Sequence, residues 1–125
     1  MTDREGVRRW TDAYERAWRA SDPDAVDALF TEDAEYRRSP VEPPIRGLGA
    51  IRAIWGEDEG AGFRFRAEPI AVEGDRAVVR AHFEYLDPPQ PYVDLWVLRF
   101  APDGRAAEFE EWPYWPGRGY TAREG

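Results

Sequence analysis

The sequence predicts an α+β domain in which N-terminal helices pack on a curved antiparallel sheet. In the first 55 residues, apolar side chains recur at spacings of three and four, as in amphipathic helices. From residue 63 onward they alternate within runs separated by tight turns, as in hairpin-linked strands. The chain of 125 residues shows no internal repeat. We therefore expect a single domain over 1–116 and a loose tail over 117–125.

Two helices are expected first. The longer one starts at a capping box formed by Thr2 and Glu5. The shorter one follows Asp22, which caps it, and Pro23, which suits its first position, and it ends near 31–33. The apolar face of the longer helix consists of Val7, Trp10, Tyr14, Ala17 and Trp18.

The middle of the chain is broken up by proline and glycine. A short strand is expected over 34–38, and the three prolines within 40–44 forbid regular structure after it. A third short helix opens at Gly47, and 56–62 is predicted to be an exposed acidic loop.

Four strands complete the predicted sheet. Turns at 73–75 and 102–104 connect neighbouring strands, whereas the proline-rich segment 87–91 is a stiffer connection. The expected strands cover 63–72, 76–86, 92–101 and 105–115.

Composition excludes several kinds of site. The chain has no cysteine, and His82 is its single histidine, so thiolate nucleophiles and histidine-rich metal sites are ruled out. His82 lies two positions from both Arg80 and Glu84, so we expect it with them on the outer sheet face, away from the pocket. The net charge of −8 disfavours nucleic acid, and no apolar run approaches the roughly 20 residues that span a bilayer. We expect a cytoplasmic protein without metal or cofactor.

Several short patterns run along most of the chain. Trp10, Tyr14 and Trp18 recur at intervals of four and precede Asp22. The segment 28–34 reads Ala-Leu-Phe-Thr-Glu-Asp-Ala, and Pro40, Gly47-x3-Ile51-Arg52 and the four-strand ending follow. Over residues 5–116 this resembles the nuclear transport factor 2-like superfamily, which includes SnoaL-like proteins and ketosteroid isomerase. The resemblance implies a cone-shaped, cystatin-like fold with a pocket at its wide end, and dimers are common in that family.

The resemblance carries over only part of the ketosteroid isomerase site. Tyr14 falls where those enzymes place the tyrosine that donates to the substrate oxyanion. Their general-base aspartate falls at Arg38, or at Ser39 with a one-residue shift, and their protonated pocket aspartate falls at Trp96. Because two of the three catalytic groups are replaced, ketosteroid isomerase activity is not expected.

Aromatic side chains are predicted to converge inside the sheet. Strand alternation turns one set of rings toward the apolar face of the first helix. The enclosure is either a pocket for a small apolar molecule or a solid aromatic core. The candidate substrate-binding residues are Trp10, Trp18, Arg38, Trp55, Tyr85, Trp96, Phe109 and Glu111.

Asp94 is the principal candidate for catalysis. It lies between Tyr92 and Trp96 on the inner face of its strand, where burial would raise its pKa toward that of a general base. Tyr14 would then donate a hydrogen bond to the developing oxyanion. Alternatively, Asp94 is paired with Arg38 or hydrated at the mouth, and Tyr14 is one more core aromatic.

Glu111 and Arg38 are weaker candidates. Glu111 has the same inward alternation as Asp94, but it also belongs to an acidic strand with Glu108 and Glu110. Arg38 could bind a ligand carboxylate through both guanidinium nitrogens, or instead cap a strand or pair with Glu35.

The outer sheet face is also apolar in one strand. Val93, Leu95 and Val97 alternate with the inward residues, so this strand is covered on both sides. A single domain has no helix left for the second face. We therefore predict a homodimer through the outer sheet face.

Three functions fit these observations. The first is a small-molecule pocket protein, acting as a cofactor-free isomerase, cyclase or dehydratase by acid–base chemistry. The second is a ligand-binding protein without catalysis. The third is a structural dimerisation module with a solid core. An unpaired buried carboxylate beside a cavity would favour the enzyme.

Overall fold

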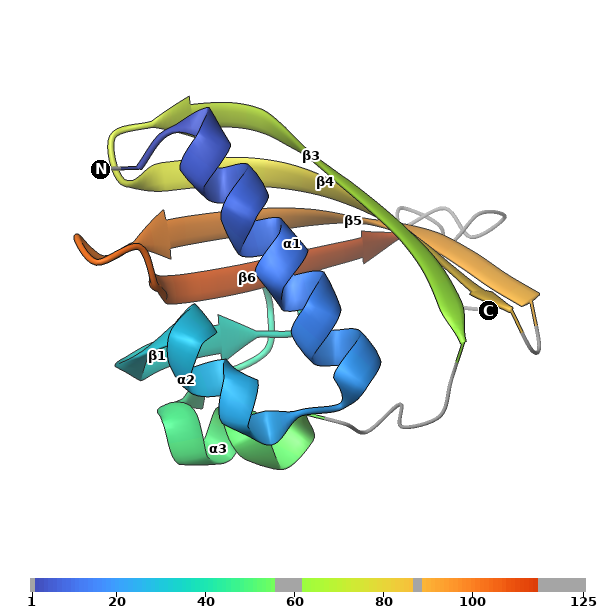
Figure 1. Ribbon diagram of the computed structural model, residues 1–125, viewed down its shortest axis with the longest axis horizontal. Coiled ribbons are helices and arrows are strands. Elements are labelled where there is room, and N and C mark those ends of the chain that lie inside the picture. The colour runs from blue at the N-terminus through green and yellow to red at the C-terminus, as the bar shows by residue number, and fades with distance from the viewer. Residues whose placement is uncertain (1, 56–61, 87–88, 115–125) are drawn as a thin grey trace.

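A long helix crosses one face of a curved six-stranded sheet in the computed structural model, which describes residues 2–55, 62–86 and 89–114 (Figure 1). This helix is α1 (Arg4–Ala20), and two short helices, α2 (Val26–Leu29) and α3 (Leu48–Ile54), pack near β1. The predicted α+β class is therefore confirmed. The expected tail and most of the expected acidic loop lie outside the described residues.

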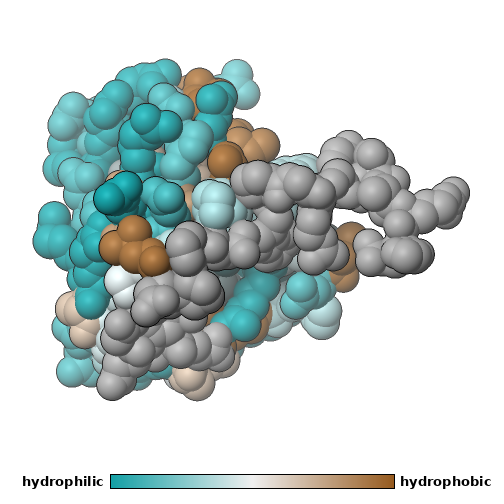
Figure 2. All heavy atoms as spheres, turned by 90° about the vertical axis from the view of Figure 1, so that its right-hand side faces the viewer, coloured by the Kyte–Doolittle hydropathy of each residue, from teal (hydrophilic) through white to brown (hydrophobic). Residues whose placement is uncertain are grey.

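The surface seen from one end of the sheet is mainly hydrophilic where it is described, with hydrophobic residues in separate patches (Figure 2). None of the helices in the described part of the chain is long and apolar enough to cross a membrane.

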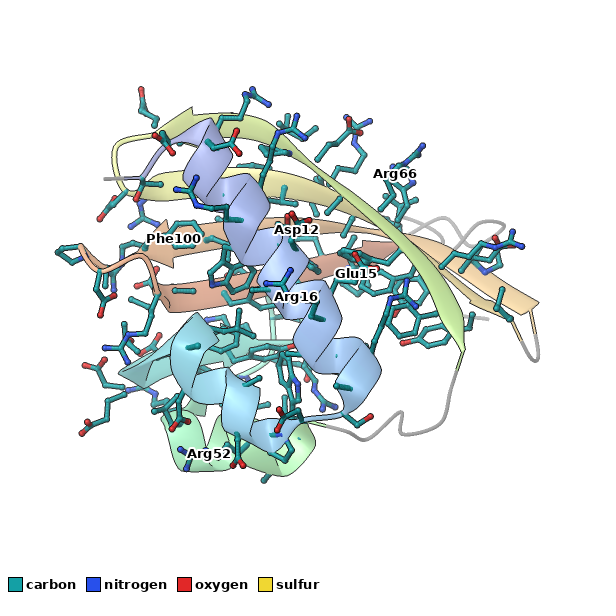
Figure 3. The ribbon with its side chains drawn as sticks, in the orientation of Figure 1. Asp12, Glu15, Arg16, Arg52, Arg66 and Phe100 are labelled. Carbon is teal, nitrogen blue, oxygen red and sulfur yellow. The ribbon has the colours of Figure 1, made fainter. Side chains whose placement is uncertain are left out.

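The first helix begins one residue later than the predicted capping box. Its N-cap is Asp3, not Thr2, because the Asp3 carboxylate accepts a hydrogen bond from the Gly6 amide at 2.7 Å. Asp12 and Arg16 come from the exposed side of α1 (Figure 3). The opposite side buries Val7, Trp10, Thr11, Tyr14 and Ala17.

The second helix is shorter than predicted. Asp22 caps it as expected, accepting from the Asp24 amide at 3.0 Å, and a 3-10 turn at Pro23–Ala25 leads into α2. The helix ends at Leu29, before the predicted 31–33. Phe30 already pairs with Ala106 in the sheet, and both residues are fully buried. Burial of this aromatic in the sheet outweighs the helical tendency of the acidic residues after it.

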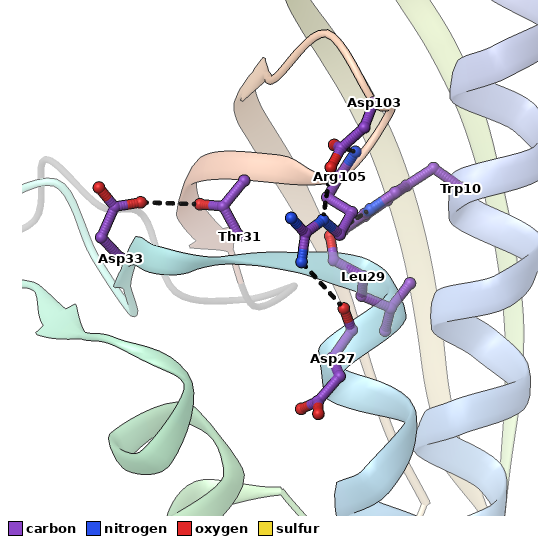
Figure 4. Close-up of polar contacts among 7 residues, drawn as sticks. All are labelled: Trp10, Asp27, Leu29, Thr31, Asp33, Asp103 and Arg105. Carbon is purple, nitrogen blue, oxygen red and sulfur yellow. Dashed lines mark hydrogen bonds and ion pairs between the residues drawn. The ribbon is translucent and has the colours of Figure 1, made fainter.

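Polar contacts tie the end of α2 to distant parts of the chain (Figure 4). The Trp10 indole N–H donates to the Leu29 carbonyl at 2.9 Å, and the Arg105 guanidinium donates to the Asp27 carbonyl at 3.5 Å. These bonds satisfy carbonyls that a helix end leaves without intrahelical partners. They also fix the position at which β1 starts.

The sheet has the strand order β2-β1-β6-β5-β4-β3. The prediction of an all-antiparallel sheet was wrong at one place, because β1 runs parallel to β6. The hairpin rule fixes direction only for consecutive strands, and four strands separate β1 from β6 in the chain. β2 was not predicted. The strands are β1 (Phe30–Arg37), β2 (Ile45–Arg46), β3 (Phe63–Glu73), β4 (Arg76–Leu86), β5 (Pro89–Phe100) and β6 (Ala106–Tyr114).

Alternation along β4 and β5 agrees with the prediction. On β4, Val79, Ala81 and Phe83 are buried while Arg80 is exposed. On β5 the inward residues Asp94, Trp96, Leu98 and Phe100 are buried. The core therefore lies between this face and α1, and one carboxylate lies within it.

Candidate functional site

Two carboxyl groups meet on the inner face of β5 and β6. The register pairs Trp96 with Glu111 and Asp94 with Pro113, so Asp94 and Glu111 are diagonal neighbours across the strands. Their side chains are joined by a hydrogen bond. Asp94 is 0% exposed and Glu111 is half-buried. The structure thus brings together two candidates that lie 17 positions apart in the sequence.

The oxygens of Asp94 have unequal environments. Oδ2 accepts the indole N–H of Trp96 at 3.2 Å. Oδ1 is buried and has no conventional donor among the described residues. Burial raises the pKa of Asp94, while its hydrogen bonds to Glu111 and Trp96 act in the opposite direction.

The environment of Glu111 raises its pKa more strongly. Burial is the first cause, and the hydrogen bond and negative charge of Asp94 add to it. The hydroxyl of Tyr36, which donates to Glu111 Oε1 at 3.3 Å, and the charge of Arg38 lower it in part. Two adjacent buried carboxyls cannot both ionise easily, so they titrate as one unit.

A second tyrosine extends the hydrogen-bonded chain onto α1. Burial raises the pKa of Tyr14 well above its ordinary value, and the hydrogen bond to Tyr36 raises it further. The same bond lowers the pKa of Tyr36, whose net shift is upward because of burial. The single proton of the Tyr36 hydroxyl goes to Glu111 Oε1, so Tyr36 can only accept from Tyr14. The chain therefore runs from Tyr14 through Tyr36 to Glu111 and Asp94.

Aromatic rings enclose the tyrosine end of this chain. The ring of Tyr14 lies 4.7 Å from Trp96 and 5.4 Å from Trp55, centroid to centroid. The ring of Phe109 stacks on Tyr36 at 4.7 Å. The Tyr14 ring also contacts Trp10, Trp18, Phe65 and Phe109. The ring of Trp96 also contacts Asp94 through its N–H, so the inner end of the carboxyl pair adjoins this aromatic cluster, which agrees with the effect of burial on its pKa values.

The model of the SnoaL-like domain family matches residues 7–109, which is most of the chain. The chain belongs to the SnoaL-like family. A search of curated proteins found no match.

Solved structures share the fold of this SnoaL-like chain at low sequence identity. An NTF-2-like protein of unknown function from Burkholderia xenovorans is 20% identical with a TM-score of 0.71, covering 97% of each chain. A ketosteroid isomerase-like protein from Erwinia carotovora is 22% identical with a TM-score of 0.66, over 90% of this chain and 97% of that one. An LEH-like epoxide hydrolase of M. tuberculosis is 19% identical with a TM-score of 0.67, over 90% and 86%. At these identities the likeness shows the fold alone.

Two of the predicted substrate-binding residues, Arg38 and Tyr85, lie away from Asp94. Arg38 is exposed and lines a surface groove of about 440 Å³ with Trp112 and Tyr114. Its charge acts on Glu111 and Tyr36, whereas the hydrogen-bond partners of Asp94 are Glu111 and Trp96. Tyr85 is half-buried near the end of β4 and stacks on Tyr92.

Sequence reasoning missed Tyr36. It lies on β1 with 2% of its surface exposed, alternating with Arg37 in a strand expected from the sequence. That alternation was the available signal, but it could not show which strand lies beside β1. Among the described residues, no three histidine or acidic side chains gather into a potential metal site.

Proposed function

We propose that this SnoaL-like protein binds a small apolar molecule and acts on it by cofactor-free acid–base chemistry: isomerisation, cyclisation or dehydration. The single observation that carries the proposal is the hydrogen-bonded Asp94–Glu111 pair, buried beside an aromatic cluster. A carboxylate in apolar surroundings is a stronger base than one in water, because the charged form has lost hydration.

Asp94 is the proposed general base. It would take a proton from the substrate and become a carboxylic acid, while Tyr14 stabilises the negative charge that develops on a substrate oxygen. The Tyr14 hydroxyl has one proton, which it now donates to Tyr36. To serve the substrate, that O–H must turn away from Tyr36 toward the ligand oxygen.

The aromatic residues and Arg38 are the proposed binding groups. An apolar ligand would pack against the rings of Trp10, Trp18, Trp55, Trp96 and Phe109, most of which are buried in contact with one another, and against Tyr85 beside Tyr92. Glu111 stays in contact with both Asp94 and solvent. Arg38 beside it is placed to meet a polar group on the ligand.

A thermal-shift screen tests this function. The purified protein is exposed to fractions of a metabolite extract, and compounds that raise its melting temperature are incubated with it and analysed by mass spectrometry. Asp94→Asn is expected to lower turnover by about 100-fold or more while the fold persists. Asp12→Asn, an exposed change on α1 (Figure 3), is the matched control. Full turnover by Asp94→Asn would remove Asp94 from the reaction.

The alternative is a non-catalytic ligand-binding or structural module. The close ring contacts around Tyr14 favour it, because the space between α1 and the sheet contains many large side chains. Compounds that stabilise the protein without being converted would support a binding function. A screen in which no compound raises the melting temperature would support the structural one.

We also propose that the protein is a homodimer through its outer sheet face. On that face Leu95 is paired with Trp112, which is 37% exposed, and Val97 is paired with Val78. Charge favours a second copy as the partner. Arg66 on β3 (Figure 3) and Glu110 on β6 flank this apolar patch on opposite sides. In a two-fold symmetric dimer, Arg66 of each protomer can lie close to Glu110 of the other, which gives two equivalent ion pairs.

A further inference from the structure

We propose that Asp94 and Glu111 hold a single proton between them, that Glu111 carries it, and that Tyr36 is the positioning residue that, by donating to Oε1, places this proton on Oε2. This inference rests on the proposed function for its chemical meaning. Its test does not require a substrate.

The hydrogen-bond inventory of Asp94 leads to the shared proton. Oδ2 has the Trp96 indole N–H as its donor, but buried Oδ1 has no donor while Glu111 is ionised. A buried acceptor without a donor is costly, and two neighbouring negative charges add to that cost. One proton between the two carboxyls removes both problems.

The direction of the tyrosine chain decides which carboxyl carries the proton. The Tyr36 hydroxyl donates its only proton to Glu111 Oε1, at 3.3 Å. Oε1 is therefore an acceptor, which leaves Oε2 to carry the proton and donate it to Asp94. Asp94 is the better place for the charge because the Trp96 N–H already stabilises it.

The charged and titratable groups around the pair come from three other directions. Tyr14 belongs to α1, Tyr36 belongs to β1, and Arg38 directly follows β1. Tyr92 lies on β5, two residues before Asp94. The positive charge of Arg38 favours ionisation of Glu111. The negative charge of Asp94 and burial act against it.

The consequence is a resting site with one acceptor and one donor. When Asp94 takes a proton from a substrate carbon, Glu111 can deliver its own proton to another substrate atom or to a departing hydroxyl. The pair still holds one proton afterwards, now on Asp94. Passing it back across the Asp94–Glu111 hydrogen bond restores the starting state. Isomerisation and dehydration both balance in this way.

Carboxyl ¹³C NMR on the whole chain tests the arrangement. In wild-type protein labelled at the glutamate side-chain carboxyl, Glu111 is expected to titrate at a distinctly higher pH than the exposed glutamates. Asp94→Asn should lower the midpoint of Glu111, because a negative neighbour is lost. Tyr36→Phe should raise it, because a donor to the charged form is lost. Tyr85→Phe is the matched control and should leave it unchanged.

Two results would overturn the inference. One is a wild-type Glu111 that titrates together with the exposed glutamates, a measurement that needs no variant to fold. The other is a Tyr36→Phe protein with a native amide spectrum and an unchanged Glu111 midpoint. Either result leaves Asp94 open to test by turnover, so failure of the shared proton is distinguishable from failure of the proposed function.

Discussion

Trp96 donates its indole N–H to the carboxylate of Asp94, two residues earlier on the same strand, at 3.2 Å. Both side chains are 0% exposed. The same tryptophan ring lies 4.7 Å from Tyr14 and 5.0 Å from Phe109. One residue therefore fills the centre of the core and supplies a donor to the candidate base.

Replacing Trp96 separates these two contributions. Trp96→Ala is expected to lower the free energy of unfolding by about 3–5 kcal/mol, because a large buried ring is removed. Trp96→Phe keeps most of the packing and loses the donor, so it should cost less and raise the pKa of Asp94. Chemical denaturation measures the first effect and aspartate carboxyl NMR the second. Equal stability losses for the two variants would contradict this division.

Stability is expected to depend on pH through Glu111. The pKa of Glu111 is raised in the folded state, so the folded protein binds more protons than the unfolded chain above the ordinary glutamate range. The contribution of this group to stability therefore falls as pH rises through that window. Glu111→Gln mimics the protonated acid and should raise the melting temperature relative to wild type more at pH 8 than at pH 4.

The matched comparison is Glu108→Gln, on the outer side of the same strand. It removes one negative charge at a half-buried surface position. If the two variants show the same pH dependence relative to wild type, the effect reflects net charge and not the buried pair.

Activity, once a substrate is found, should have a bell-shaped pH profile. The singly protonated Asp94–Glu111 pair is the active form, so the rate falls at low pH, where both carboxyls are protonated, and at high pH, where both are ionised. Asp94→Glu keeps two carboxyl groups in the site, so its pH profile should remain bell-shaped. Measuring kcat/KM across pH gives the two limbs, and a flat profile would argue against an acid–base pair.

The dimer prediction concerns the opposite face of β5. Leu95→Arg places a charge at the centre of the apolar patch and should convert the protein from about twice the mass of one chain to a monomer in light scattering. Arg66→Glu should weaken the dimer, and Arg66→Glu combined with Glu110→Arg should restore it. A wild-type protein that is monomeric at micromolar concentration would contradict the proposal.

Much of this arrangement follows from local pattern. Helical spacing of Trp10 and Tyr14 and alternation of Asp94 and Trp96 decide which side chains turn inward, because both depend on residues close together in the chain. The same parity selects Glu111 over Glu110 as the glutamate that faces the core. These features needed no knowledge of distant contacts.

The tertiary structure alone decided the partners. Tyr36 and Glu111 are 75 positions apart and meet because β1 lies parallel to β6, a pairing that no hairpin connects and no local pattern specifies. The diagonal placement of Asp94 and Glu111 depends likewise on the register between β5 and β6. Sequence determined which groups enter the core. The order and register of strands, set by how the whole chain buries its rings, determined which of those groups touch.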